Sequence, residues 1–109
     1  MAQPLERQII ERARALIATP ATWTQGEFAR NASGERVSWR SPQAKRFCVW
    51  GALNRAAYDT TGDRRQSIAL ADHAARTLRN GATSLSGTND RGTHNDVLAI
   101  FDSYLKQLP

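Results

Sequence analysis

Cysteine is almost absent from this sequence, and long apolar runs are missing altogether. The single cysteine among 109 residues, Cys48, can form no internal disulfide and excludes a Cys-rich metal framework. The longest strongly apolar run, residues 47–53, is much shorter than the roughly 18 residues that a membrane span requires. Residues 1–14 alternate charged and apolar side chains and lack the apolar segment of a secretory signal. These absences predict a cytoplasmic protein that makes no contact with a membrane.

Sequence motifs of common enzymes and metal sites are missing as well. The chain contains no Walker loop, no Gly-x-Gly-x-x-Gly, no Gly-x-Ser-x-Gly and no His-Glu-x-x-His. Its two histidines lie far apart and its carboxylates are scattered, so no spacing of metal ligands emerges. The sequence therefore predicts neither a cofactor nor a metal.

Apolar residues recur at helical spacing in four segments, which predicts four helices. Capping signals support three of them: Ser41-Pro42 opens the second helix, Asp63 the third and Thr93 the fourth. Gly81 is the expected stop of the third helix. We place the helices at about residues 4–18, 42–59, 64–80 and 93–107, with a polar loop over residues 82–92.

Residues 24–39, between the first two helices, predict a short β-hairpin. Apolar and polar side chains alternate over about 24–30 and 35–39, around a turn signal at 31–34. The second helix is apolar on nearly every side, which predicts that it is buried at the centre, and Gly51 in its middle would let a neighbouring helix approach closely. The predicted fold is a single, mostly α domain over residues 1–109: a four-helix bundle-like arrangement with the hairpin inserted between helices one and two.

Positive charge is concentrated in one segment. The formal net charge is +5, and residues 30–55 contain six basic residues against one acid. The ordinary interpretation is a solvated, arginine-rich surface. The functional interpretation is a contact surface, because a local excess of this kind attracts an acidic protein face or phosphates, and arginine beside an aromatic can form a hot spot. The candidate binding residues are Arg30, Arg36, Trp39, Arg40, Lys45 and Arg46.

Cys48, His94 and Asn89 form the one set of residues that suggests catalysis by a thiolate. Such a nucleophile needs a base and an orienting group, and these residue types supply both. Against this, Cys48 is expected at least a turn and a half inside a buried helix, where cysteine behaves as a small hydrophobe. His94 is expected to turn inward as a capping or buried, hydrogen-bonded histidine. A Cys48-dependent hydrolase or transferase is therefore the least favoured function.

The pair Asn89-Asp90 either satisfies backbone groups of the predicted loop or forms a polar site for a ligand. Together with Trp23 and the Cys-x-x-Gly-Ala-Leu segment at residues 48–53, the pair resembles a pattern found in a family of small bacterial and phage-borne helical proteins with a domain of unknown function. The resemblance covers about residues 5–107 and implies no activity. It implies that four residues belong to one structural or functional unit: Cys48, Gly51, Asn89 and Asp90.

These observations favour a small, non-enzymatic binding or adaptor protein whose basic segment contacts an acidic protein partner. Nucleic-acid binding by the same segment is the alternative. The two differ in their salt dependence, because contacts to phosphates make affinity fall steeply as salt is added.

Overall fold

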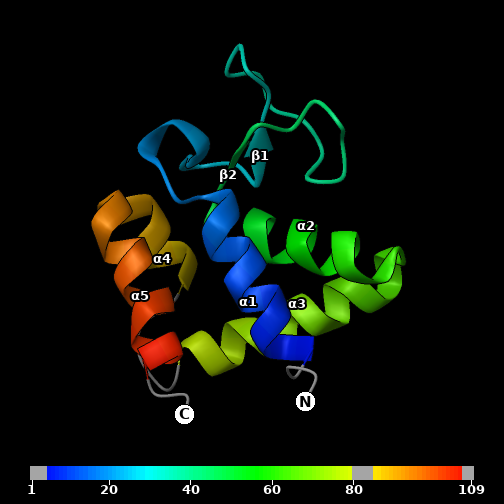
Figure 1. Cartoon of the computed structure of the whole chain (residues 1–109). Coiled ribbons are helices and arrows are strands. Elements are labelled where there is room, and N and C mark those ends of the chain that lie inside the picture. Colours follow the sequence, from blue (N-terminus) through cyan, green and yellow to red (C-terminus); the bar gives the residue numbers. More distant parts are fainter. Residues whose placement is uncertain (1–4, 80–84, 107–109) are drawn as a thin grey trace.

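The computed structural model describes residues 5–79 and 85–106, over which the chain is mostly helical, as predicted. These residues form five α-helices, one more than expected, and a small two-stranded antiparallel sheet. Figure 1 shows how they are arranged. The helices are α1 (Leu5–Leu16), α2 (Val49–Thr61), α3 (Arg64–Arg79), α4 (Leu85–Arg91) and α5 (His94–Lys106). A 3₁₀ turn, η1 (Pro20–Thr22), precedes the strands β1 (Ala29–Arg30) and β2 (Arg46–Phe47). No helix in the described ranges is long and apolar enough to cross a membrane.

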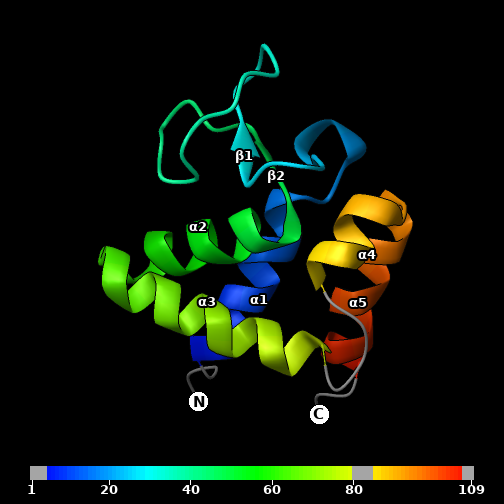
Figure 2. The ribbon, with the colours of Figure 1, turned by 180° about the vertical axis from the view of Figure 1, so that it is seen from behind.

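The second helix, α2, is buried at the centre of the fold, as its all-round apolar pattern predicts. It packs against both α1 and α3, and α1 lies in front of α3 in Figure 1 and behind it in Figure 2. The turn between α2 and α3 is tight because Gly62 adopts a left-handed conformation with φ of 73°. α4 and α5 lie side by side at one end of this group, as both views show.

Two of the three helix starts predicted from local capping signals, at Asp63 and Thr93, are confirmed. The Asp63 carboxylate accepts a hydrogen bond from the backbone N–H of Gln66 at 2.9 Å, and α3 begins at the next residue. Thr93 and Asp96 exchange two hydrogen bonds, of 2.8 and 3.1 Å, at the start of α5. The stop predicted at Gly81 and the helix ends predicted near residues 4, 80 and 107 lie outside the described residues.

The predicted hairpin is half wrong. The turn at 31–34 is present, closed by the Asn31 carboxamide, which accepts from the N–H groups of Ser33 and Glu35. The strand predicted at 35–39 is absent: β1 pairs instead with β2, in the register Ala29↔Phe47 and Arg30↔Arg46. Only one isolated bridge, Arg30↔Arg36, lies in the predicted strand. The side chains there alternate because Val37 and Trp39 pack against the core from an irregular loop.

The start predicted for the second helix is also wrong. Ser41-Pro42 opens a turn rather than a helix, and the Ser41 hydroxyl accepts from the N–H of Gln43. Pairing of β2 with β1 withdraws Arg46 and Phe47 from any helix, so α2 begins at Val49 and Cys48 becomes its N-cap. Tertiary pairing has overridden the local helical pattern.

Two further expectations need correction. The predicted loop at 82–92 contains the helix α4, whose Leu85 and Asn89 are buried. Gly51 does permit a close approach, but the neighbour is the backbone of Phe28 and not another helix. The segment before β1 therefore lies directly on the first turn of α2, and this contact builds the site described next.

Candidate functional site

One buried carboxamide, that of Asn89, joins three parts of the fold. Asn89 is 1% exposed, although the next two residues of α4, Asp90 and Arg91, are exposed. The oxygen Oδ1 accepts from the indole Nε1 of Trp23 at 2.8 Å and from the backbone N of Val49 at 3.0 Å. The nitrogen Nδ2 donates to the carbonyl of Thr24 at 3.0 Å and to Asp90 Oδ1 at 3.2 Å. Both ends of the amide are satisfied, so Asn89 ties α4 to the segment before β1 and to the first turn of α2.

A second set of hydrogen bonds fastens the same segment to the end of α4. Gln25 Nε2 donates to the carbonyl oxygens of Asn89 and Gly92, at 2.8 and 3.1 Å. The backbone N–H of Gly26 donates to Asp90 Oδ1 at 3.0 Å. Asn89-Asp90 thus satisfies backbone groups, as the ordinary interpretation expects, but those groups belong to a segment more than sixty positions earlier in the chain.

These contacts leave a cavity of about 220 Å³ beside the start of α2. The structure therefore brings Cys48, Asn89 and Asp90 to one place, with Gly51 in the adjoining helical turn. The cavity carries two carboxyl side chains and one thiol on its wall. Its lining residues are Gly26, Glu27, Phe28, Cys48, Asn89 and Asp90.

The Cys48 thiol is held in its protonated form. Its sulfur caps α2 by accepting from the N–H of Gly51 at 3.3 Å, and the residue is 6% exposed. Burial raises the pKa of the thiol, and the charge of Asp90 raises it further. The N–H groups of Gly51 and Trp50 lower the pKa by less than burial raises it. A helix N-terminus normally favours a thiolate, but here desolvation prevails, so the group is a poor nucleophile near neutral pH.

His94 does not complete a catalytic arrangement with Cys48. Its Nε2 lies 2.6 Å from the carbonyl oxygen of Ile17, and its ring packs against Trp23 with centroids 5.5 Å apart. Asn89, the proposed orienting group, uses its carboxamide on the partners described above. His94 is therefore a hydrogen-bonded histidine, as the ordinary interpretation expects, but it is half-buried rather than buried. It joins the start of α5 to the chain just after α1.

Labelling of Cys48 tests this description of the thiol. We expect iodoacetamide to react slowly with the native protein near neutral pH and quickly once denaturant is added. Because the folded-state pKa is raised, the native rate should begin to climb only above the usual range of a thiol pKa, roughly 8.5. For the same reason, the thiol favours the folded state at neutral pH, and this contribution is lost as the pH rises through the folded pKa. Equal rates with and without denaturant at neutral pH would show an accessible thiolate.

The predicted basic residues fall into two groups, those hydrogen-bonded within the protein and those whose charge faces solvent. Arg30 belongs to the first group. Its guanidinium donates to Thr24 Oγ1 and to the carbonyls of Gly34 and Gln25, at 3.0, 3.0 and 3.4 Å. It holds the loop around β1 and presents little free charge. Trp39 is half-buried and packs edge-on against Tyr58, with ring centroids 5.9 Å apart.

The remaining basic residues of the segment are more available. Arg36 is exposed and lies 4.0 Å from Glu27. The guanidinium of Arg40 lies 6.0 Å from the centre of the Trp39 ring. Arg40, Lys45 and Arg46 have no carboxylate within ion-pair distance among the residues that the structure places. These four side chains, Arg36, Arg40, Lys45 and Arg46, are called the basic surface below.

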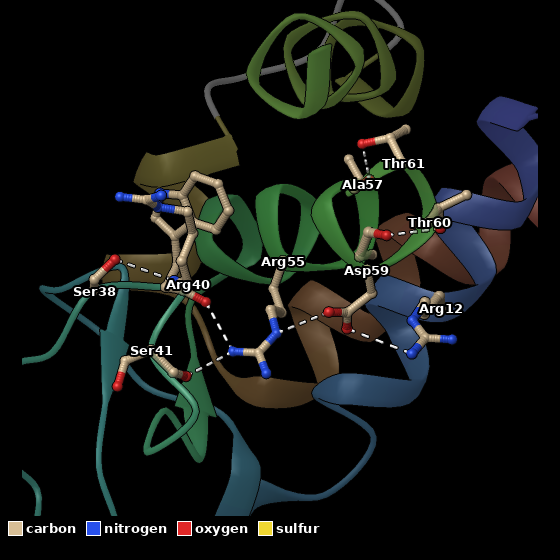
Figure 3. Close-up of polar contacts among 11 residues, drawn as sticks. Arg12, Ser38, Arg40, Ser41, Arg55, Ala57, Asp59, Thr60 and Thr61 are labelled. Carbon is tan, nitrogen blue, oxygen red and sulfur yellow. Dashed lines mark hydrogen bonds and ion pairs between the residues drawn. The ribbon is translucent and has the colours of Figure 1, made fainter. Parts of the chain in front are cut away.

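Arg55, one of the six basic residues of the segment 30–55, holds this surface in place (Figure 3). Its Nη1 donates to the carbonyls of Trp39 and Ser41, at 3.0 and 2.8 Å. Its Nε lies 3.2 Å from Asp59, which also meets Arg12 at 3.4 Å. The loop that carries Arg40 is thus fixed to α2. Only the Arg55–Asp59 pair, at helical spacing, has a signal in the sequence.

A comparison with models of protein families shows to which family this chain belongs. A family model, described as a family of unknown function (DUF6197), matches residues 1–104. The chain belongs to this DUF6197 family. Comparison with curated proteins and with solved structures gives no match. DUF6197 membership confirms the resemblance to a family of unknown function and assigns no activity, so function must be argued from the surface of the molecule.

An apolar groove of about 500 Å³ lies next to the basic surface. It is bounded by the segment 28–39 on one side and by α2 and α3 on the other; Figure 2 shows the side of the molecule on which α3 lies in front of α1. Phe28 and Ile68, two of its lining residues, are 56% and 43% exposed. We call this feature the aromatic groove, lined by Phe28, Trp39, Trp50, Asn54, Arg65, Ile68, Ala69 and Asp72.

Proposed function

We propose that this DUF6197 protein is a non-enzymatic binding or adaptor protein, and that its basic surface contacts an acidic face of a partner protein. The observation that carries the proposal is the state of Arg40, Lys45 and Arg46. These three cations have no carboxylate partner among the described residues. The loop that carries Arg40 is nevertheless fixed, because Arg55 binds the carbonyls of Trp39 and Ser41 on either side of it. A rigid, uncompensated positive surface suits association with a complementary negative face.

The chemistry of the cavity beside α2 supports a binding role over an enzymatic one. A nucleophilic thiol needs a lowered pKa or an adjacent base. Burial raises the pKa of Cys48, and His94 Nε2 is bonded to Ile17. The groups that the sequence suggests for catalysis hold the fold together instead.

Nucleic-acid binding remains the second candidate, on the same surface. A duplex or single strand needs a track of cations along its phosphates. Arg30 and Arg55 are committed to the protein's own carbonyl groups, and Arg36 lies near Glu27. The remaining track is short, so we favour the acidic protein partner.

A charge-deletion pair tests the proposal. We expect Arg36→Ala with Arg40→Ala to weaken binding of a labelled poly-glutamate peptide about tenfold, because two exposed charge contacts together contribute about 1–2 kcal/mol. The melting temperature should change by less than about 3 °C, since exposed substitutions rarely alter stability. Fluorescence anisotropy gives the affinity and thermal denaturation gives the melting temperature.

The control variant is Arg91→Ala with Lys106→Ala, which removes the same charge from exposed positions on α4 and α5. It should leave peptide affinity nearly unchanged. An equal loss in both double variants would mean that only net charge matters and would overturn the proposal. Tighter, steeply salt-dependent binding of oligo-dT than of the peptide would favour the nucleic-acid alternative.

A further inference from the structure

The aromatic groove leaves large apolar side chains open to solvent at one place. Three large apolar residues are exposed in the described part of the chain, and two of them, Phe28 and Ile68, line this groove. Trp39 and Trp50 form its deeper walls and pack against the core behind them. Isolated exposed apolar residues are ordinary, whereas a hollow that gathers several marks an interaction site more often than chance.

The charges around the groove determine what kind of partner it suits. The one carboxylate in its wall, Asp72, is paired with Arg76 at 2.9 Å. Arg65, also in the wall, has no carboxylate partner among the residues described. Arg40 lies 6.0 Å from the ring of Trp39. The rim is therefore positive on both sides of an apolar floor.

We infer that the aromatic groove receives two neighbouring apolar anchor residues from an acidic, amphipathic segment of the partner protein. The carboxylates beside the anchors meet Arg40 and Arg65. This inference rests on the proposed function and names the part of the partner that gives it specificity. The aromatic groove has a volume of about 500 Å³, within the range of roughly 300–1,000 Å³ that holds a drug-sized ligand. This is more room than one side chain fills. Grooves that accept amphipathic segments commonly take anchors in this way.

Two other occupants fit the observations less well. A second copy of this chain brings the same net charge of +5 to a rim that is already positive. A nucleic-acid base needs an open aromatic face to stack on, but Trp39 and Trp50 are half-buried and the opposite wall contains aliphatic Ile68 and Ala69. An acidic segment with apolar anchors matches both the floor and the rim.

Three synthetic peptides of equal length separate these features. The first combines glutamates with Phe and Leu anchors at helical spacing. The second replaces both anchors with alanine, and the third keeps the anchors but replaces the glutamates with glutamine. We expect the first peptide to bind the full chain about tenfold more tightly than either of the others, because burial of one large apolar side chain alone can account for such a factor.

The exposed groove residues provide variants that should still fold. Ile68→Ser and, separately, Phe28→Ser are expected to remove the advantage of the anchored peptide over the alanine peptide, while leaving affinity for the alanine peptide unchanged. Leu5→Ser is the matched control, because Leu5 is the third exposed large apolar residue and lies on α1, outside the groove. It should retain the full advantage.

The outcomes distinguish the groove from the basic surface. If the two acidic peptides bind equally, and both weaken in the Arg36→Ala with Arg40→Ala variant, the basic surface stands and the groove inference is overturned. If no peptide binds, both are overturned. Anchored and glutamine peptides of equal affinity would contradict the acidic rim. Binding of oligo-dT that is lost in Ile68→Ser, or concentration-dependent dimerisation that is lost in Ile68→Ser, would assign the groove to another occupant.

Discussion

Replacing Gly51 with alanine is expected to lower the free energy of unfolding by about 3 kcal/mol or more, at the upper end of what overpacking produces. A Cβ built on Gly51 would lie 1.9 Å from the carbonyl oxygen of Phe28 and 2.8 Å from its carbonyl carbon. Both are backbone atoms, so no rotamer change relieves the contact. The same carbonyl accepts a hydrogen bond from the N–H of Cys48 at 3.1 Å, which fixes its position.

Urea unfolding followed by tryptophan fluorescence measures this loss. Gly34→Ala is the control, because Gly34 has a φ of 86° but nothing lies within 4 Å of its added Cβ. That variant should show only the cost of a left-handed alanine, about 1–2 kcal/mol. We also expect Gly51→Ala to speed the labelling of Cys48. Phe28 and Cys48 line the same cavity, so a displacement of Phe28 opens that cavity to the reagent. A Gly51→Ala protein as stable as the wild type would show that the start of α2 does not lie against this carbonyl.

The starts of α3 and α5 were predictable from local signals. Asp63 caps α3 through a residue three positions away, and Thr93 and Asp96 cap each other at the same separation. A pattern of this length can be recognised in the sequence because both partners lie in one turn. The buried centre of α2 was predictable for a similar reason, since its apolar residues cover all sides of the helix.

The second strand could not be predicted in the same way. Phe47 continues the apolar pattern of α2 and would extend the helix if only its neighbours mattered. Its partner, Ala29, lies eighteen positions earlier in the chain. Because Phe47 pairs with Ala29, α2 cannot include Phe47 and begins only after its N-cap, Cys48. Residues 35–39 show the opposite error, because Val37 and Trp39 alternate with polar residues but pack on the core without a ladder. Periodicity predicts which side chains are buried better than it predicts the hydrogen bonds of the backbone.

The sequence groups three residues that the fold does bring together, but it does not show what each of them contacts. Cys48, Asn89 and Asp90 line one cavity, but three of the four partners of the Asn89 carboxamide lie 40 to 66 positions away in the sequence. Arg30 and Arg55 cannot be distinguished from exposed arginines by charge alone. Only the fold places carbonyl groups around their guanidinium groups.

Removal of the Asn89 carboxamide is expected to be the second severe change. Asn89→Ala would leave the indole N–H of Trp23, the N–H of Val49 and the carbonyl of Thr24 without this partner. Each buried polar group left unpaired is worth about 1–3 kcal/mol, so a total loss of about 3 kcal/mol in the free energy of unfolding is expected. Urea unfolding gives the value, and the emission of Trp23 should shift as its indole loses the hydrogen bond.

Two single-atom exchanges show whether the loss comes from the hydrogen bonds or only from the lost volume. Asn89→Asp keeps an acceptor for Trp23 and Val49, but it replaces the donor to Thr24 with a charged oxygen beside the Asp90 carboxylate. It should therefore destabilise about as much as Asn89→Ala, and more at neutral pH than in acid, where the new carboxyl is protonated. Asp90→Asn keeps an oxygen for the N–H of Gly26 at an exposed position and should change stability by less than about 1 kcal/mol. If Asn89→Asp were as stable as the wild type, the donor to Thr24 would be dispensable, and Asn89 would act as a spacer in the wall of the cavity.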